Sequence, residues 1–451
     1  MYDRKVAPTI RWPEFEQAES SMNEMPRAFL ERLFRAAVAA AHPAGSLPAQ
    51  LPPPPAKGRI VLLAAGKAAG SMAEVAEQHY REVHGLTADR LGGLAVARHG
   101  YGRPTQYVRM VEAGHPVPDQ AGLDAATQTL ELADAAGADD LVLVLMSGGA
   151  SANWIAPAAG ITLAEKQAVT RALLRSGAHI GEINTVRKHL SRIKGGRLAV
   201  RSYSARLLTL AISDVPGDDP AVIGSGPTVP DPTTLADARA VVAKFRLDLP
   251  EAVARALNDP ANESPKPGGA AFAGSEFRLI ARPVDALRAA EALARQAGYE
   301  CLVLGDQLEG EAREVAQKQA ERALKLQADG RKALILSGGE LTVTMRGKGR
   351  GGPNQEYALA LAAALDGARG IAALAADTDG TDGGGGDASD PAGAYIDPTT
   401  LARARALGQD PAAFLADNDS TGFFTGLGDL VNPGPTYTNV NDFRAILVDR
   451  P

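Results

Sequence analysis

The sequence is poor in cysteine, and it lacks long apolar runs and an excess of positive charge. Cys301 is the only cysteine among 451 residues, so no internal disulfide can form, and its apolar neighbours indicate a small packed side chain. No stretch approaches the roughly 18 apolar residues that a membrane span requires. The net charge of -6 argues against sequence-independent binding of nucleic acid or of an anionic membrane. Any anion must therefore bind at a local site.

The common signatures of nucleotide, hydrolase and zinc sites are also absent. The chain has no G-x-x-x-x-G-K-[ST] phosphate loop, no G-x-S-x-G and no H-E-x-x-H, and no G-x-G-x-x-G fingerprint directly follows a predicted strand. The acidic residues in the first thirty positions are unlike a signal peptide. We therefore expect a cytoplasmic protein that acts on a small molecule, without a nucleic-acid or membrane partner. Whether it forms a homodimer is left open.

The length predicts two domains, because 451 residues exceed the usual size of a single hydrophobic core. The segment 258–270 combines proline, glycine and polar residues, and it is the best candidate for a linker. We therefore expect a first domain at 25–260 and a second at 271–451.

One pattern recurs in both halves of the chain. A short apolar run ends in glycine or aspartate, and a polar loop then leads to an alanine-rich helical stretch. Such runs suit strands covered on both faces, so each half is expected to be an α/β lobe with a mostly parallel sheet flanked by helices. Ligands bind beyond the carboxyl ends of such strands, which is where these glycines and aspartates fall. The runs begin at Arg59, Asp139, Arg206, Cys301, Lys332 and Gly370.

Two short glycine loops directly follow predicted strands. Glycine lets the backbone approach a ligand, and the N–H groups of the next helical turn bind anions. A tight turn explains either loop alone, but the two together favour phosphate. The residues expected to bind the nucleotide are Ser147, Gly148, Gly149 and Ser151 in the first loop, Ser337, Gly338, Gly339 and Glu340 in the second, and Asn354 at the next helix start.

Two cations stand where a bound phosphate would lie. Lys67 comes just after a strand, and the first turn of a helix disfavours a cation unless an anion is bound nearby. Arg350 lies in the glycine-rich segment GKGRGGPNQE, where a guanidinium can bind phosphate or carboxylate with two parallel hydrogen bonds. The alternatives are an ordinary surface lysine and a structural glycine turn. We expect both side chains to take part in catalysis.

A basic segment, INTVRKHLSRIKGGRLA, begins at Ile183 and predicts one helix that runs from its Asn-Thr pair to its Gly-Gly pair. Lys188 and Arg192 would then share a face, and this face is either solvated or neutralised by a ligand. Arg187 or Lys188 is the expected receptor for a substrate carboxylate. His115, in the loop AGHPVPD, is a further candidate for substrate binding.

Carboxylates follow two of the predicted strands. Asp214 opens the loop DVPGDDP, and Asp379 lies in the oxygen-rich stretch ADTDGTDGGGGDASD. Asp214 is a candidate both for holding Mg²⁺ and for accepting a proton from a substrate hydroxyl. We expect Asp214 or Asp379 to bind Mg²⁺, with a flexible solvated loop as the alternative for the second stretch.

Together these motifs resemble the glycerate 2-kinase family, whose C-terminal part is the MOFRL domain and whose members are often labelled hydroxypyruvate reductases. The resemblance covers about residues 25 to 448. It rests on GKAA at Gly66, AGHPVPD at Ala113, SGGAS at Ser147, INTVRKHLSRIKGGRLA at Ile183, SDVPGDDP at Ser213, SGPT at Ser225, SGGE at Ser337, GRGGPNQE at Gly349, DTDGTDG at Asp377 and GPTYTNVND at Gly434.

The resemblance implies ATP-dependent phosphorylation of D-glycerate at its 2-hydroxyl, giving 2-phosphoglycerate, with Mg²⁺ and an active site between two α/β domains. The functional lysine and arginine of the family correspond to Lys67 and Arg350. The sequence departs from the family pattern in SANWIAP, where the family has a SALLP-like stretch, and at Pro353, where a basic residue is common. These departures bear on substrate choice.

Two other functions compete with the kinase. An NAD(P)H-dependent hydroxypyruvate reductase would need a dinucleotide site, and no fingerprint for one follows a predicted strand. A non-catalytic sensor of phosphorylated metabolites would need no opposed lysine and arginine, and it usually carries an output module such as a DNA-binding domain.

Overall fold

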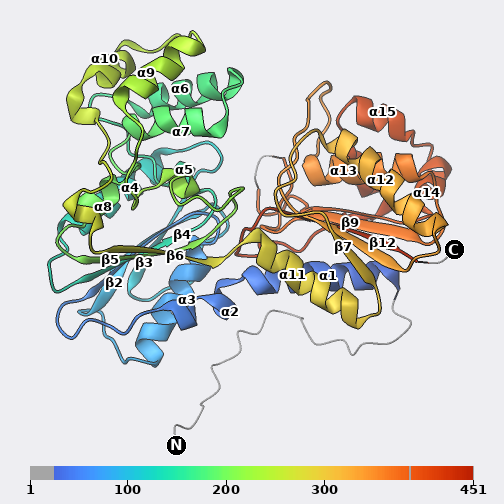
Figure 1. The fold of residues 1–451 in the computed structure, drawn as a ribbon, viewed down its shortest axis with the longest axis horizontal. Coiled ribbons are helices and arrows are strands. Elements are labelled where there is room, and N and C mark those ends of the chain that lie inside the picture. The colour runs from blue at the N-terminus through green and yellow to red at the C-terminus, as the bar shows by residue number, and fades with distance from the viewer. Residues whose placement is uncertain (1–24, 385–386, 450–451) are drawn as a thin grey trace, which may run out of the picture.

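The computed structural model describes residues 25–384 and 387–449, which form two α/β lobes side by side (Figure 1). Each lobe is built on a six-stranded sheet, which confirms the predicted fold of two α/β lobes. Within the described ranges, no helix is long and apolar enough to cross a membrane.

The sheet of the first lobe is parallel throughout, as its apolar strand sequences predict. Its strand order is β3-β2-β1-β4-β5-β6. The central strands are buried along their whole length because helices cover both faces (Figure 1). The strands are β1 (Ile60–Ala65), β2 (Leu91–Arg98), β3 (Val108–Ala113), β4 (Leu141–Met146), β5 (Arg206–Ile212) and β6 (Ser275–Ala281). The helices are α2 (Pro43–Ser46) and α3 (Ala69–Glu82) on one side, and α4 (Gln120–Asp134), α5 (Ala150–Asn153) and α8 (Arg197–Arg201) on the other.

The sheet of the second lobe is mixed, which corrects the prediction of a mostly parallel sheet. Its order is β11-β10-β9-β12-β8-β7, and of these neighbours only β7 and β8 pair in parallel. β12 enters between β9 and β8 from the loop 432–441, without the crossover helix that a parallel neighbour requires. The strands are β7 (Glu300–Val303), β8 (Ala333–Ser337), β9 (Ile371–Asp377), β10 (Gly393–Ile396), β11 (Leu430–Val431) and β12 (Asp442–Val448).

The helices of the second lobe lie on both faces of its sheet (Figure 1). One face is covered by α1 (Pro26–Ala41) and α11 (Pro283–Gln296), which pack against each other. The other face carries α12 (Ala312–Ala328), α13 (Pro353–Leu365), α14 (Thr400–Ala406), α15 (Pro411–Ala416) and α16 (Ser420–Leu427).

Short 3-10 turns occur earlier in the chain, before β7. They are η1 (Pro48–Gln50), η2 (Ile223–Ser225), η3 (Pro260–Asn262) and η4 (Ala270–Phe272).

The strand pairing moves the boundary between the lobes away from the predicted division into 25–260 and 271–451. β6 lies beyond the proline-rich linker, yet it pairs with β5 and completes the first sheet. α1 belongs to the first predicted domain, yet it packs against α11 and β9 of the second lobe. By strand pairing the first lobe therefore extends to Ala281, and the second lobe takes the N-terminal helix.

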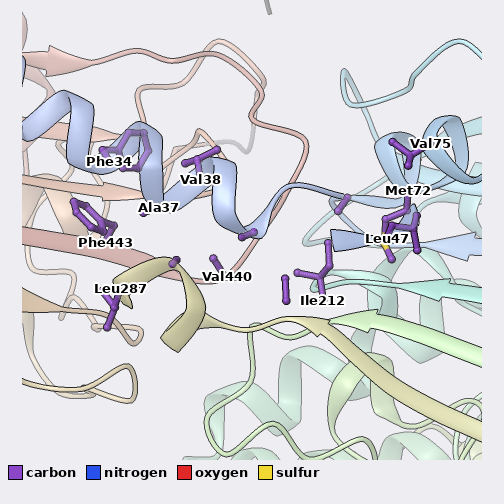
Figure 2. Close-up of a cluster of buried hydrophobic side chains, with 14 of the residues drawn as sticks. Phe34, Ala37, Val38, Leu47, Met72, Val75, Ile212, Leu287, Val440 and Phe443 are labelled. Atoms are coloured by element: carbon purple, nitrogen blue, oxygen red, sulfur yellow. The ribbon is translucent and has the colours of Figure 1, made fainter. Parts of the chain in front are cut away.

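One hydrophobic cluster continues from lobe to lobe (Figure 2). Phe34 of α1 packs against Phe443 of β12, with their ring centroids 5.9 Å apart. The same cluster continues through Leu47 to Met72 of α3 and Ile212 of β5. The two lobes are therefore joined by a shared core as well as by the chain.

Four helices of the first half form a separate unit with its own small core above α5 (Figure 1). Helix α7 (Ile180–His189) corrects the prediction of a single long basic helix. It begins earlier than predicted because His179 and Glu182 form a capping box, and a turn held by the Ser191 hydroxyl follows its end. The four helices are α6 (Leu163–Arg175), α7 (Ile180–His189), α9 (Leu235–Lys244) and α10 (Glu251–Asn258).

Polar residues collect at one edge of each sheet, where the lobes meet. In the first lobe, β1 leads into Lys67 and β4 into Ser147. In the second lobe, β9 ends at Asp377, and Asp442 at the start of the antiparallel β12 pairs with it. The predicted site residues Lys67, Ser147 and Asp379 therefore lie at this junction.

Candidate active site

Lys67 and Asp379 form a buried ion pair between the lobes. Lys67 follows β1, and its backbone N–H donates to the carbonyl of Gly148 at 2.8 Å. Asp379 follows β9, and its Oδ2 lies 2.7 Å from Lys67 Nζ. The exposed fraction is 15% for the lysine side chain and 1% for the aspartate, so water screens the pair weakly. A fixed cation thus stands where the edges of the two sheets meet.

Arg98, at the end of β2, is a second cation beside Asp379. Its Nη1 lies 3.5 Å from Asp379 Oδ2 and donates to Thr381 Oγ1 at 3.1 Å. Asp379 Oδ1 accepts the N–H and the hydroxyl of Thr381 at 2.8 and 3.0 Å. Burial opposes the negative charge, but Lys67 outweighs it and lowers the pKa of Asp379. Both oxygens of Asp379 are engaged, which makes it an anionic anchor for Lys67.

Two further carboxylates surround Lys67. Burial, reinforced by the charge of Asp379, raises the pKa of Asp377 well above its ordinary value. Burial also raises the pKa of Asp214, although Lys67 opposes this. Asp214 Oδ2 accepts a hydrogen bond from Asn439 Nδ2 of the second lobe at 2.7 Å. For Lys67, burial is outweighed by the three carboxylates, so its pKa is raised and its charge is retained.

This set of carboxylates fits one magnesium ion bound together with a phosphate ligand. Across residues 25–384 and 387–449, no three His, Cys, Asp or Glu side chains form a group that could hold a metal ion. Mg²⁺, however, usually takes only one or two protein carboxylates and completes its shell with water and phosphate oxygens. Among the described residues, Asp214 and Asp377 each accept a hydrogen bond from another residue on one carboxylate oxygen only. They are therefore better placed to bind a metal than Asp379.

The first glycine loop packs tightly against these carboxylates. A Cβ atom on Gly148 would overlap Asp214 Oδ2, so only glycine fits there. Gly149 adopts a φ of +86°, which disfavours any other residue. Among the described residues, the N–H groups of Gly148 and Gly149 meet no acceptor. They are free to bind an anion, and their contact with a nucleotide stays a prediction.

The serine hydroxyl groups of the two loops form hydrogen bonds with other parts of the protein. Ser147 Oγ accepts the backbone N–H of Ala68 at 2.9 Å, and Ser151 Oγ lies 2.7 Å from Ser225 Oγ. Ser337 is buried at the end of β8. These three side chains shape the loops, and contact with a nucleotide stays a prediction for them.

The second glycine loop is held by Arg444, a buried residue of β12. Its Nη2 donates to the carbonyls of Gly338 and Gly339. In the part of the chain that the structure describes, the N–H groups of Gly339 and Glu340 have no acceptor. The Glu340 side chain reaches solvent, yet enclosure by protein and the charge of Asp442 raise its pKa. This loop too presents free backbone donors.

Asn354 supports the site from within the protein, and its contact with a nucleotide stays a prediction. The residue is fully buried, and its Nδ2 donates to Asp442 Oδ1 at 2.6 Å and to Asp382 Oδ1 at 3.2 Å. Asp382 also accepts the N–H groups of Asn354 and Gln355 in the first turn of α13. Burial raises the pKa of Asp382 to about 7, with Asp442 adding to the effect.

Arg350 lies on an exposed segment beside this network. Its N–H donates to Asp419 Oδ1 at 3.1 Å, and its side chain has no polar partner among the described residues. Gly352 packs against Asp382, so the segment borders the loop that carries the anchor of Lys67. The letters GKGRGG match a dinucleotide fingerprint, but β8 has already ended at Ser337, and the required turn from strand to helix is missing.

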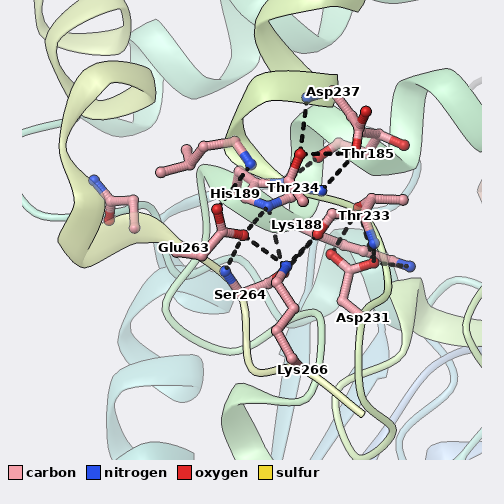
Figure 3. A network of polar contacts seen from close by, with 12 residues as sticks. Thr185, Lys188, His189, Asp231, Thr233, Thr234, Asp237, Glu263, Ser264 and Lys266 are labelled. Carbon is pink, nitrogen blue, oxygen red and sulfur yellow. Dashed lines mark hydrogen bonds and ion pairs between the residues drawn. The ribbon is translucent and has the colours of Figure 1, made fainter.

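Lys188 and Arg187 differ in their surroundings. Lys188 Nζ lies 3.4 Å from Asp231 Oδ1 with both side chains buried, inside a polar network that includes His189 and Glu263 (Figure 3). The Arg187 guanidinium is half-buried and forms no hydrogen bond or ion pair among the described residues, and burial lowers its pKa. Lys188 thus stabilises the helical unit, and of the two Arg187 is the one available to an anion.

Lys194 follows α7 and contacts the first glycine loop. Its Nζ donates to the carbonyls of Ser151 and Trp154, each at 2.9 Å. Burial lowers the pKa of Lys194 to about 7, and the charge of Arg187 adds to this shift. Lys194 therefore ties the segment after α7 to the first glycine loop.

His115 lies on the other side of the first glycine loop. A Cβ atom on Gly149 would be 3.0 Å from His115 Cδ2. Burial, helped by the charges of Lys67 and Arg98, lowers the pKa of His115 to about 3. Its imidazole is therefore neutral near pH 7 and can exchange hydrogen bonds with a bound ligand.

Sequence reasoning missed Arg98, Arg444 and Asn439. Arg98 ends a strand at the edge where the other site residues lie, which was a usable signal. Arg444 stands inside the apolar run FRAILV, where a buried arginine implies partners. Asn439 gave no signal beyond its polar loop, because only the fold brings it to Asp214.

The fold and the site define a two-lobed α/β protein with a lysine and a group of carboxylates at the junction of its lobes. A domain of unknown function, DUF4147, matches residues 29–258, and the MOFRL family matches residues 333–442. An Agrobacterium vitis protein, provisionally named hydroxypyruvate reductase, is 49% identical over 94% of both chains. A Thermotoga maritima protein named D-glycerate 2-kinase is 40% identical over 85% of this chain and 89% of its own.

A crystal structure of glycerate kinase from Thermotoga maritima matches with a TM-score of 0.80 at 37% identity, and it covers 94% of this chain and 99% of its own. The chain therefore belongs to the glycerate 2-kinase family, which confirms the resemblance found in the sequence.

Proposed function

We propose that the protein transfers the γ-phosphoryl group of ATP to the 2-hydroxyl of D-glycerate and releases 2-phosphoglycerate. The observation that carries this proposal is Lys67, which Asp379 holds beside two loops with free backbone donors. Fixed cations and N–H groups are what phosphoryl transfer requires, because charge is spread over the transferring oxygens. The name of the Thermotoga maritima relative supports the choice of substrate.

The nucleotide is bound by backbone and cations. The N–H groups of Gly148 and Gly149 donate to phosphate oxygens, as do those of Gly339 and Glu340 from the other lobe. Lys67 and Arg350 offset the charge of the transferring group. Asp379 is a positioning residue in this account, since both of its oxygens are taken by protein donors.

Two carboxylates have separate roles in this account, one in metal binding and one in proton transfer. Asp377 would hold Mg²⁺, which supplies positive charge to the phosphate oxygens when it is bound. Asp214 accepts the proton that the 2-hydroxyl loses as the new P–O bond forms, and its raised pKa suits a base. Arg187 binds the glycerate carboxylate, and the neutral His115 donates or accepts a hydrogen bond at a substrate hydroxyl.

The alternative is an NAD(P)H-dependent hydroxypyruvate reductase, as the name of the Agrobacterium vitis relative suggests. One assay separates the two functions. The purified protein is given D-glycerate, ATP and Mg²⁺ while ADP is followed, and in parallel hydroxypyruvate with NADH. Formation of ADP that depends on glycerate supports the kinase. Oxidation of NADH without formation of ADP refutes it.

A further inference from the structure

Three cations alternate with glycines in the segment RGKGRG, residues 346–351. The side chains of Arg346, Lys348 and Arg350 are all exposed. None of them forms an ion pair or a side-chain hydrogen bond within residues 25–384 and 387–449. Like charges so close together repel each other, and a bound anion would relieve the repulsion.

The backbone of this segment is fixed by the strip 417–420. The Asn418 side chain accepts two of its N–H groups, at 2.7 and 3.0 Å. The carboxylates of Asp417 and Asp419 accept the N–H groups of Lys348 and Arg350 at 2.9 and 3.1 Å. The acidic side chains of the strip therefore bind the backbone, and within the described residues they form no ion pair with the three cations.

The glycines explain why the cations face away from the strip. A Cβ atom on Gly347 would overlap the backbone of Asp417, and one on Gly349 would overlap Asp419. The strip thus closes the glycine side of the segment, and the residues between the glycines are left with exposed side chains. The result is a row of cations on a rigid backbone, which loses little entropy when it binds a ligand.

The row ends beside the catalytic junction. Gly352 packs against Asp382, in the loop that also carries Asp379. Arg346 and Lys348 lead away from this point over at most about 14 Å of chain. We propose that Arg346, Lys348 and Arg350 form a track, a row of cations that binds the polyphosphate chain of a nucleoside triphosphate. This inference rests on the proposed function. Arg350 contacts the transferring end, and the other two hold the phosphates that remain in ADP.

The test is the double variant Arg346→Ala/Lys348→Ala, which keeps Arg350 and all glycines. Losing two charge-assisted contacts is expected to raise the KM for ATP about tenfold or more, with KM for D-glycerate and kcat within about twofold of wild type. Inhibition by inorganic tripolyphosphate should weaken by a similar factor. The KM for ATP should also depend less on salt than in the wild type, because fewer exposed charges are screened.

The matched control is Arg322→Ala/Lys325→Ala, which removes one exposed arginine and one exposed lysine from α12. It should leave the KM for ATP unchanged. An unchanged KM for ATP and unchanged tripolyphosphate inhibition in Arg346→Ala/Lys348→Ala refute the track while the kinase stands. If the wild type forms no ADP, the proposed function fails, and calorimetry with tripolyphosphate decides on the track alone. Binding by the wild type that the double variant loses supports the track, and absent or equal binding refutes it.

Discussion

Lys67 Nζ of the first lobe lies 2.7 Å from Asp379 Oδ2 of the second lobe, so the lysine that we propose to face the phosphate is positioned by the opposite half of the molecule. Asn439 of the second lobe likewise holds Asp214 of the first. Each lobe therefore completes the site of the other. The shared hydrophobic cluster joins the two lobes and so keeps the members of each pair next to each other.

Removing the lysine tests its catalytic role. Lys67→Ala should lower kcat by about 100- to 1000-fold, because a preorganised charge on the transferring group is lost. Asp379→Asn should lower kcat less, since Lys67 keeps its charge but loses its anchor. Steady-state release of ADP measures both, with circular dichroism to confirm folding. Near wild-type turnover in Lys67→Ala would rule out this role.

The neighbouring cations Arg187 and Lys188 should behave in opposite ways. Lys188→Ala leaves Asp231 buried without its cation, although Thr233 still donates to it, and this should cost about 3–5 kcal/mol in the free energy of unfolding. Arg187→Ala should raise the KM for D-glycerate about tenfold or more and change stability little. Urea denaturation and initial rates separate the two effects. A stable Lys188→Ala protein with a raised KM would reverse the assignment.

Gly148 should tolerate no side chain. Gly148→Ala places a Cβ atom onto Asp214 Oδ2, so it should displace that carboxylate and lower kcat by roughly 100-fold or more. Gly274→Ala is the control, since a Cβ atom there meets nothing within 4 Å and its φ is not in the left-handed region. Equal activity of the two variants would show that the loop is not packed against Asp214 in the working enzyme.

His115 should make stability depend on pH. Its pKa is about 3 in the folded protein and near 6.5 when exposed, so between these values the unfolded chain binds more protons. Its contribution to the free energy of unfolding therefore rises with pH from about 3 to 6.5 and is constant above. Urea denaturation between pH 4 and 7 should show a steeper rise for the wild type than for His115→Gln. Parallel curves would contradict the neutral imidazole.

The sheet of the first lobe was predictable because its strands are uniformly apolar and end in glycine or aspartate. The mixed sheet of the second lobe was not, since β12 carries the same kind of apolar run as its parallel counterparts. Only the connection that leads into β12 decides that this strand runs antiparallel to its neighbours. β6 was assigned to the wrong lobe because a linker composition marks a break in the chain and not a break in strand pairing.

The site was predictable where a residue directly follows a strand, as Lys67, Ser147 and Asp214 do. It was not predictable where function depends on a partner from the other lobe. The role of Asp379 as an anchor follows from Lys67 and Arg98, which lie far away in the sequence. Lys188 and Arg187 are adjacent in the sequence, and only their burial and partners distinguish them.

The most direct test of the central claim is the identity of the product. The wild-type protein is incubated with D-glycerate, ATP and Mg²⁺, and the phosphoester is assigned by phosphorus and proton NMR. The account predicts 2-phosphoglycerate in equal amount to the ADP formed, and loss of both in Lys67→Ala. Absence of any phosphoester, with NADH consumed when hydroxypyruvate is supplied, would contradict it.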